Sequence, residues 1–161
     1  MGVESSNRRF ECSVEINVTV HAAYELWANC ENFPRFMQGI QEVYRVDARH
    51  LHWRAQIWDE VTEWDAEILE EIPDVRISWA TVTGDRIAGI VTFTPLGGGR
   101  VQVTHAIELQ GVEEEEAESI IHRRISQDLE RFRDFAEKRS GKPESTSQIQ
   151  NVPRMKRKMI R

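Results

Sequence analysis

Residues 113–139 read EEEEAESIIHRRISQDLERFRDFAEKR, a stretch that contains neither proline nor glycine. Apolar residues recur in it at spacings of four, four, four, three and four, which places them on one face of a helix. These residues are Ala117, Ile121, Ile125, Leu129, Phe132 and Ala136. Acidic side chains begin the segment and Lys138 and Arg139 end it, as the helix dipole favours. The pattern predicts one continuous helix, about 40 Å long at 1.5 Å per residue.

The segment before this helix has the pattern of a strand. Residues 101–109, VQVTHAIEL, alternate between apolar and polar side chains, which is typical of a strand that is buried on one face. His105 stands on the apolar face, between Val103 and Ile107. Three glycines at 97–99 predict a tight hairpin that leads back to a strand over 87–96, in which Gly89 indicates a bulge.

The same alternation predicts five further strands, over residues 10–18, 40–47, 49–57, 61–72 and 75–81. Two short helices are expected after the first of them, over 22–29 and 30–37. Strands joined by short turns form an antiparallel sheet, and the long helix must bury its stripe on that sheet. The predicted class is therefore α+β: a curved antiparallel sheet of about seven strands wrapped around one long C-terminal helix, with two short helices after the first strand.

Composition suggests one globular domain with tails. The 161 residues divide into a flexible N-terminus (1–7), a domain (8–140) and a polar, basic tail (141–161). The net charge is −6; residues 142–161 carry six basic side chains against Glu144, a net of +5, which leaves −11 for the rest. An acidic body argues against nucleic-acid binding. The tail would contact an acidic partner or a membrane surface through Arg154, Lys156, Arg157, Lys158 and Arg161.

Other classes of protein and site are disfavoured. No apolar run approaches the roughly 20 residues that span a bilayer, and the N-terminus lacks the apolar core of a secretory signal, so a cytoplasmic protein is expected. Cys12 and Cys30 form no metal-binding motif; Cys12 is interpreted as a core thiol, with a disulfide as the alternative. His50, His52 and His122 have no ligand partners at metal spacing. No metal and no cofactor are predicted.

A cavity is expected between sheet and helix, because one narrow apolar stripe does not fill a wide concave face. Trp53, Trp64 and Trp79 lie on the apolar faces of three consecutive strands and are interpreted as core residues that also line this cavity. Trp27 is expected to pack the first helix, and Trp58 lies near a strand end. The full predicted lining is Trp53, Trp64, Trp79, His105, Ile68, Phe93, Ile121 and Ile125.

His105 has two interpretations. It is either a core histidine hydrogen-bonded to a neighbour or water, or a polar anchor that contacts a ligand oxygen or transfers a proton. It is the one weak catalytic candidate. Five carboxylates on the 61–72 strand resemble paired acids, but alternation places most of them on the solvated outer face. They are Glu63, Asp65, Glu67, Glu70 and Glu71.

The chain resembles the START-like (SRPBCC) superfamily with the helix-grip fold, and within it the polyketide cyclase/dehydrase and coenzyme Q-binding (START) group. The resemblance lies in residues 10–43, 50–79, 89–109 and 128–139, including AAYELWANCENFPRFM (22–37) and WDAEILEEIPDVRISW (64–79). It implies the fold, a deep pocket and a hydrophobic ligand, but no particular reaction. In aromatase/cyclase relatives it implies a cavity arginine on the strand of Trp64; Ile68 stands there instead, and Arg54 and Arg76 fall on outer faces.

These observations predict a protein that binds a hydrophobic or aromatic small molecule in the cavity, like polyketide cyclase/dehydrase proteins. If it is an enzyme, it would act by positioning a reactive chain for cyclisation, aromatisation or dehydration. The alternative is a non-catalytic carrier of a lipid or a coenzyme Q-like quinone. A protein whose tail binds a partner is a third hypothesis, and the chain would be a monomer or a homodimer.

Overall fold

The computed structural model describes residues 8–57, 59–83, 86–110 and 115–139. The expected N-terminal and C-terminal tails and Trp58 lie outside these residues. The elements are β1 (Arg8–Ile16), α1 (Val20–Ala28), the 3-10 helix η1 (Cys30–Asn32), α2 (Phe33–Phe36), β2 (Ile40–Arg45), β3 (His50–Ile57), β4 (Glu60–Ile72), β5 (Arg76–Thr81), β6 (Ile87–Gly97), β7 (Arg100–Leu109) and α3 (Glu115–Arg139).

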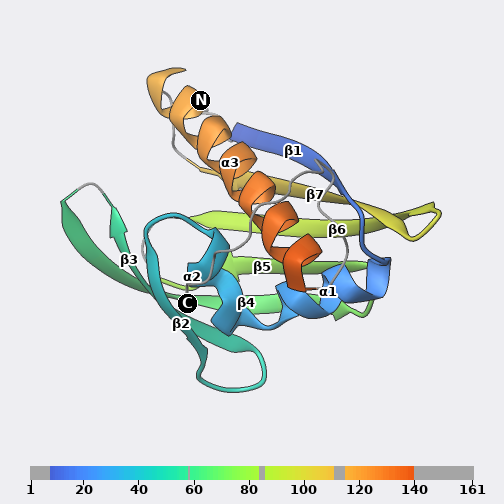
Figure 1. Ribbon diagram of the computed structural model, residues 1–161. Helices are drawn as coiled ribbons and strands as arrows, with labels where there is room; N and C mark the ends of the chain where they lie inside the picture. Colours follow the sequence, from blue (N-terminus) through green and yellow to red (C-terminus); the bar gives the residue numbers. More distant parts are fainter. Residues whose placement is uncertain (1–7, 58, 84–85, 111–114, 140–161) are drawn as a thin grey trace, which may run out of the picture.

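All strands join one antiparallel seven-stranded sheet in the order β1-β7-β6-β5-β4-β3-β2. The sheet curves around α3, and α1 and α2 lie at one end of the helix (Figure 1). The predicted α+β helix-grip architecture is therefore confirmed. The second short helix differs from the prediction, because it is divided into η1 and α2, with Pro34 in the first turn of α2.

The start of α1 is fixed by a cap. The Thr19 side chain accepts a hydrogen bond from the Ala22 N–H at 3.1 Å, which satisfies one of the free donors of the first turn. The helix therefore begins at Val20, two residues earlier than the sequence indicated. This placement turns Ala23, Tyr24 and Trp27 toward the core.

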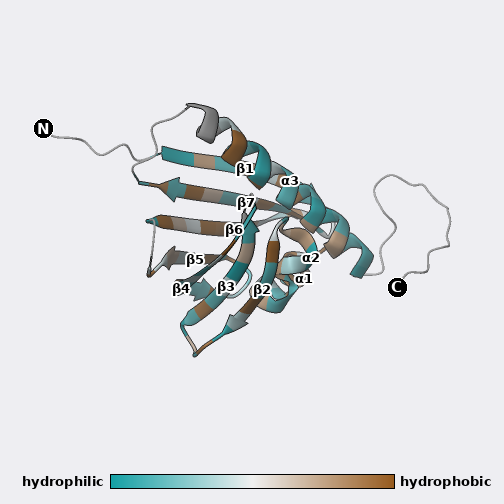
Figure 2. Ribbon diagram, turned by 90° about the vertical axis from the view of Figure 1, so that its left-hand side faces the viewer, coloured by the Kyte–Doolittle hydropathy of each residue, from teal (hydrophilic) through white to brown (hydrophobic). Residues whose placement is uncertain are grey.

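The core is densest at the C-terminal half of α3. Leu129, Phe132 and Ala136 are fully buried there, and the Phe132 ring lies 4.9 Å from both the Trp27 and the Phe36 ring. Farther toward the N-terminus the same helix is less covered: Ile121 is half-buried. Brown, apolar segments of the sheet and of α3 appear along the ribbons in Figure 2. The helix is thus packed closely through its C-terminal half, whereas its middle borders a cavity.

The expected bulge at Gly89 is wrong, because β6 pairs without a register shift there. The shift in β6 lies instead between Pro95 and Gly97. Gly89 has a different role, which depends on Trp79 and is described with the cavity.

A bulge that the sequence did not indicate lies in β4, between Ile68 and Glu70. One extra residue, Leu69, interrupts the alternation and lies 47% exposed. Beyond it the two faces exchange places, so that Glu71 points to the inner side of the sheet. The expectation that the β4 carboxylates face outward is therefore wrong for Glu71.

One buried carboxylate joins the end of α3 to the sheet. Glu137 is 1% exposed, and its Oε2 accepts a hydrogen bond from the Asn17 N–H at 3.0 Å, just after β1 ends. A charged acceptor for a backbone donor is among the stronger hydrogen bonds in proteins. Glu137 therefore fixes the turn that leads from β1 into α1.

We expect Glu137→Ala to lower the free energy of unfolding by about 1–3 kcal/mol, because it leaves the Asn17 N–H without an acceptor. Glu137→Gln keeps an acceptor oxygen and should cost less. Urea denaturation measures both. Glu130→Ala, at an exposed position of the same helix, should stay within about 0.5 kcal/mol of the parent; an equal loss in Glu137→Ala and Glu130→Ala would contradict this role.

Candidate functional site: an aromatic cavity with unpaired polar groups

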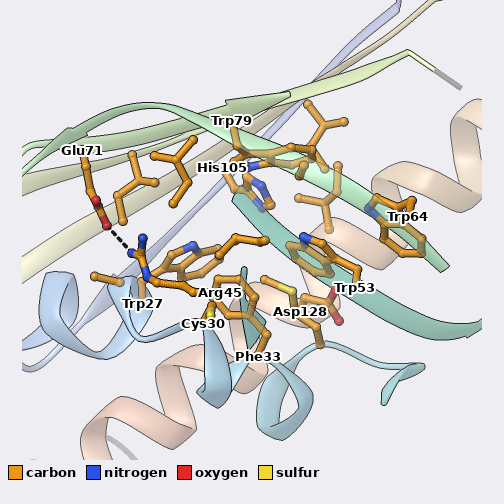
Figure 3. Close-up of a pocket in the computed structure, with 18 of the residues that line it drawn as sticks. Trp27, Cys30, Phe33, Arg45, Trp53, Trp64, Glu71, Trp79, His105 and Asp128 are labelled. Atoms are coloured by element: carbon orange, nitrogen blue, oxygen red, sulfur yellow. Dashed lines mark hydrogen bonds and ion pairs between the residues drawn. The ribbon is translucent and has the colours of Figure 1, made fainter. Parts of the chain in front are cut away.

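A cavity of about 200 Å³ lies between the sheet, the α1–α2 region and the middle of α3. Its wall is predominantly apolar and aromatic (Figure 3). Seven of the eight predicted lining residues border it: Trp53, Trp64, Trp79, His105, Ile68, Ile121 and Ile125. The eighth, Phe93, does not. It is buried beside Tyr24 of α1, 5.5 Å away in an edge-to-face contact, because Tyr24 fills the space over that part of β6.

Three aromatic rings form a stack along one side of the cavity. Trp53 lies between Phe33, at 5.2 Å and 29°, and Trp64, at 5.6 Å and 13°. Strand pairing explains half of this stack, because Trp53 and Trp64 are directly opposite on β3 and β4. Phe33 comes from α2, at the end of the sheet. The result is an aromatic wall against which an apolar or aromatic ligand can pack.

Trp27 belongs to the cavity as well, which sequence reasoning missed. Its ring meets the His105 ring edge-to-face at 5.4 Å and the Phe132 ring at 4.9 Å. It was assigned to the packing of the first helix, and it does pack there. Trp27 can both pack α1 against the core and line the cavity, because the cavity lies next to it.

Trp79 depends on the absence of a side chain on the next strand. It is paired with Gly89, and a Cβ built on Gly89 would lie 2.5 Å from Cζ2 of the Trp79 ring. Real Cβ atoms do not approach other atoms so closely. Gly89 therefore allows the Trp79 indole to lie flat against the sheet, where it forms part of the cavity wall and does not fill the cavity.

His105 lies at the centre of this apolar surface. It is paired with Cys12 of β1 and Val91 of β6, and it is 7% exposed. Among the described residues, neither ring nitrogen has a hydrogen-bond partner. Burial without a compensating partner lowers its pKa to about 4, so the ring is neutral at pH 7. One interpretation of His105 was a core histidine that is hydrogen-bonded to a neighbouring residue. The described residues provide no such partner.

Trp53 adds a second unpaired polar atom. Its Nε1 is buried and has no acceptor in the part of the chain that the structure describes. Buried polar groups in native proteins are generally paired, and exceptions call for a physical explanation. Both residues that carry such atoms, His105 and Trp53, belong to the wall of the same cavity.

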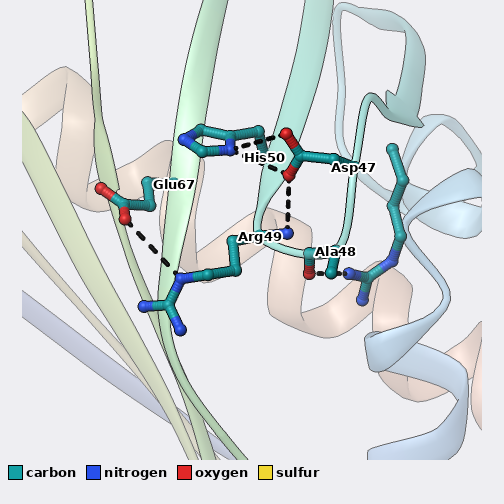
Figure 4. Close-up of polar contacts among 6 residues, drawn as sticks. Asp47, Ala48, Arg49, His50 and Glu67 are labelled. Atoms are coloured by element: carbon teal, nitrogen blue, oxygen red, sulfur yellow. Dashed lines mark hydrogen bonds and ion pairs between the residues drawn. The ribbon is translucent and has the colours of Figure 1, made fainter.

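One rim of the cavity carries an ion pair. Arg45 donates to Glu71 Oε2 at 2.8 Å and to the Ala48 carbonyl at 2.9 Å, and both Arg45 and Glu71 line the cavity. The turn from β2 to β3 is held by Asp47, which accepts from the Arg49 N–H at 2.9 Å and contacts the His50 ring at the same distance (Figure 4). These hydrogen bonds lower the pKa of Asp47.

Arg45 is thus a cavity arginine that the sequence pattern did not single out. It stands two residues after Val43, on the same face of β2. Arg124 lines the cavity too, from α3. Arg54 and Arg76 do lie outside and pair with Glu42 and Glu70.

The opposite rim is formed by α3. Asp128 lines the cavity and accepts hydrogen bonds from the Gln38 N–H at 3.2 Å and from Arg131 at 2.8 Å. Burial raises the pKa of Asp128, although these contacts and nearby arginines oppose the effect. Arg124 donates to the Gln38 carbonyl.

The remaining histidines lie outside the cavity. His52 bridges Asp65 at 2.7 Å and Glu63 at 2.6 Å on the outer face, and these hydrogen bonds raise its pKa. His122 lies 3.4 Å from the Cys12 Sγ at the β1–α3 contact. Both thiols are free, and the described residues contain no cluster of three or more groups that could hold a metal ion.

A sequence model of the family described as polyketide cyclase / dehydrase and lipid transport matches residues 16–133. The chain belongs to this family. An uncharacterised 17.2 kDa protein from the melC2-rnhH intergenic region of Streptomyces lincolnensis is 36% identical over 136 residues, which cover 81% of this chain and 91% of that protein.

Solved structures show the same fold. The Zhui aromatase/cyclase from Streptomyces sp. R1128 superposes with a TM-score of 0.70 at 13% identity, over 83% of this chain and 96% of that one. A START superfamily protein from Mycobacterium smegmatis superposes with a TM-score of 0.65 at 12% identity, over 81% and 95%. The polyketide cyclase/dehydrase assignment made from the sequence is confirmed by the family match, and the solved structures share the fold. Within the described residues, no helix is both long and apolar enough to cross a membrane.

The buried imidazole predicts a pH dependence of stability for this family member. His105 has a folded pKa of about 4, below the 6.5 of the free side chain, so the unfolded state binds its proton first. Stability should therefore fall as the pH drops from 6.5 toward 4, and this contribution should be constant above and below that window. The loss should be roughly 3 kcal/mol larger for the parent protein than for His105→Leu, at 1.36 kcal/mol per pKa unit. Urea denaturation at several pH values measures it; parallel profiles would contradict it.

We also expect Gly89→Ala to destabilise the protein by about 1–3 kcal/mol, the usual cost of overpacking a core. The new methyl group must displace the Trp79 ring, which would then narrow the cavity. In a Trp79→Leu background the same change should cost clearly less, because the ring is gone. Thermal unfolding of the four proteins gives the coupling energy; an equal cost in both backgrounds would show that the close approach to Trp79 is not the cause.

Proposed function

We propose that this protein binds a flat, uncharged aromatic molecule that carries hydroxyl or carbonyl oxygens. The ring of this molecule would pack against the stack of Phe33, Trp53 and Trp64, and its oxygens would pair with His105 and with the Trp53 N–H. The observation that carries the proposal is that two residues of the aromatic cavity wall, His105 and Trp53, carry buried polar atoms that have no partner among the described residues. An unsatisfied buried polar group costs about 1–3 kcal/mol, and a ligand oxygen would recover much of that cost.

The protonation state of His105 narrows the chemistry of the ligand. A neutral imidazole has one N–H donor and one acceptor nitrogen, whereas the Trp53 indole has a donor alone. A phenolic or enolic hydroxyl can pair with either nitrogen of the imidazole, as donor to one or as acceptor from the other, and a carbonyl oxygen can accept from the indole. A carboxylate placed at this depth would find no positive charge on the neutral ring and would lose its hydration, so the buried end of the ligand is uncharged.

The family and the structural neighbours are consistent with this binding function. One neighbour bears the name aromatase/cyclase, and the family description includes both polyketide cyclisation and lipid transport. A reaction at this site would consist of holding a chain with its reactive atoms close together, and His105 is the candidate for moving a proton there.

A quinone is the second candidate ligand. The Trp53 N–H favours it, because this donor suits a ring carbonyl. A quinone without hydroxyl groups would leave the acceptor nitrogen of His105 unpaired, however. A long unbranched lipid chain would use neither polar group.

The test compares 1-naphthol with naphthalene, which share a ring system and differ by one hydroxyl. Each displaces the fluorescent dye 1-anilinonaphthalene-8-sulfonate from the parent protein, His105→Leu and Trp53→Phe. The free-energy preference for 1-naphthol over naphthalene should be about 1–3 kcal/mol larger in the parent than in His105→Leu, because that variant cannot pair with the hydroxyl. Trp53→Phe should reduce the preference if its N–H reaches the same oxygen.

Ala66→Phe is the control for the location of the site. Ala66 is buried on the cavity wall, so a phenyl ring there would fill the space. It should abolish binding of the dye and of both ligands while the protein remains folded by circular dichroism. Retained binding, or an unchanged naphthol preference in His105→Leu, would refute the proposed function.

A further inference from the structure

Three side chains of α3 converge on one residue of the turn between α2 and β2. Asp128 Oδ1 accepts from the Gln38 N–H at 3.2 Å, Arg124 donates to the Gln38 carbonyl, and Arg131 donates to the Gln38 side-chain oxygen at 3.2 Å. Arg131 also binds Asp128 at 2.8 Å. We call this group of four residues, Gln38, Arg124, Asp128 and Arg131, the Gln38 latch.

The latch lies between the cavity and solvent. Met37, Arg124 and Asp128 line the cavity, whereas Gln38 itself is exposed. The turn of residues 37–39 therefore forms part of the cavity rim, with one side facing the cavity and the other facing water. The residue before it, Phe36, is fully buried against Phe132 and anchors the turn at that end.

Gly39 forms the other end of the turn and has the geometry of a hinge. Its φ is +85°, a conformation that side chains disfavour. A Cβ at this position would lie 2.7 Å from the Arg124 Nη2 and 2.9 Å from the Gln56 carbonyl. Glycine thus allows Arg124 to lie directly over the turn and allows the backbone there to change direction at low cost.

We propose that residues 37–39 are the gate of the cavity and that the Gln38 latch holds the gate shut. This inference rests on the proposed function, because a gate has a role only if the cavity receives a ligand. It assigns Arg131 and Gln38, neither of which lines the cavity, to the control of ligand entry rather than to ligand contact.

The energetics favour this rim over the neighbouring aromatic wall. Opening the gate exchanges partly exposed polar contacts for contacts with water, and such pairs contribute about 0–1 kcal/mol each. Opening the aromatic wall beside it would separate Trp27 and Phe36 from Phe132, at a cost of several kcal/mol for buried aromatic surface. Loop motions take nanoseconds to microseconds and lid openings take microseconds to seconds, so the gate can open and set the rate of ligand exchange without unfolding of the domain.

Stopped-flow fluorescence with 1-anilinonaphthalene-8-sulfonate tests the gate. Arg131→Gln and Gln38→Ala weaken the latch, so association and dissociation rates should both rise at least threefold. The equilibrium Kd should change by less than twofold, because neither residue contacts the ligand. Arg123→Gln, at an exposed position of the same helix, is the matched control and should leave both rates unchanged.

A covalent lock provides the reverse experiment. Gln38→Cys and Arg131→Cys, in a Cys12→Ser and Cys30→Ser background, are joined by the short crosslinker bismaleimidoethane. The comparison is the same protein with both thiols capped by N-ethylmaleimide. Crosslinking should slow association and dissociation at least tenfold relative to the capped protein, whose fold is checked by circular dichroism.

The outcomes separate the two proposals. If Ala66→Phe leaves dye binding intact, the dye does not use the cavity, and the binding function and the gate are both wrong. If Ala66→Phe abolishes binding but the crosslinked and capped proteins exchange dye at equal rates, the gate alone is wrong. A loss of stability in Arg131→Gln, with unchanged association and dissociation rates, would show that the latch is merely structural.

Discussion

The contact of Phe132 with Trp27 and Phe36 determines where α3 lies and therefore where the cavity forms. It joins the C-terminal half of α3 to α1 and α2 and is fully removed from water at Phe132 and Phe36. Because the helix is rigid and the sheet curves, close contact here leaves space between the middle of α3 and the strands β3, β4 and β5. The cavity is the geometric complement of this contact, and its aromatic wall continues the same cluster through Phe33 to Trp53 and Trp64.

A hollow core of this kind places polar groups where their environment decides their chemistry. His105 is neutral because nothing around it compensates a charge, whereas Arg45 and Glu71 remain paired because they lie at the solvent-facing rim. The cavity is thus uncharged at its centre, around His105, and carries charged side chains at its rim, Arg45 and Glu71. A molecule that enters with an apolar ring first and a polar end behind it would match this gradient.

The fold could be predicted from the sequence because its two signals are strong: the unbroken stripe of α3 and the regular alternation of the strands. The lining tryptophans and His105 followed from the same alternation. Glu71 could not be predicted, because Leu69 is apolar and its insertion into β4 leaves no pattern by which to recognise a bulge. Phe93 was misplaced because its neighbour in space, Tyr24, comes from a helix whose position the strand pattern does not determine. Arg45 could have been predicted as an inward-facing residue, because it stands two residues after Val43 in the same strand.

The bulge at Leu69 also bears on how this domain can diversify. Deleting Leu69 would restore strict alternation while Glu70 still paired with Ser78 and Glu71 still paired with Ile77, so the inner face beyond the bulge would be unchanged. Glu71 would therefore keep its ion pair with Arg45 at the cavity rim. Related chains can accordingly gain or lose one residue at this point of the strand without altering the charge that the rim presents to a ligand.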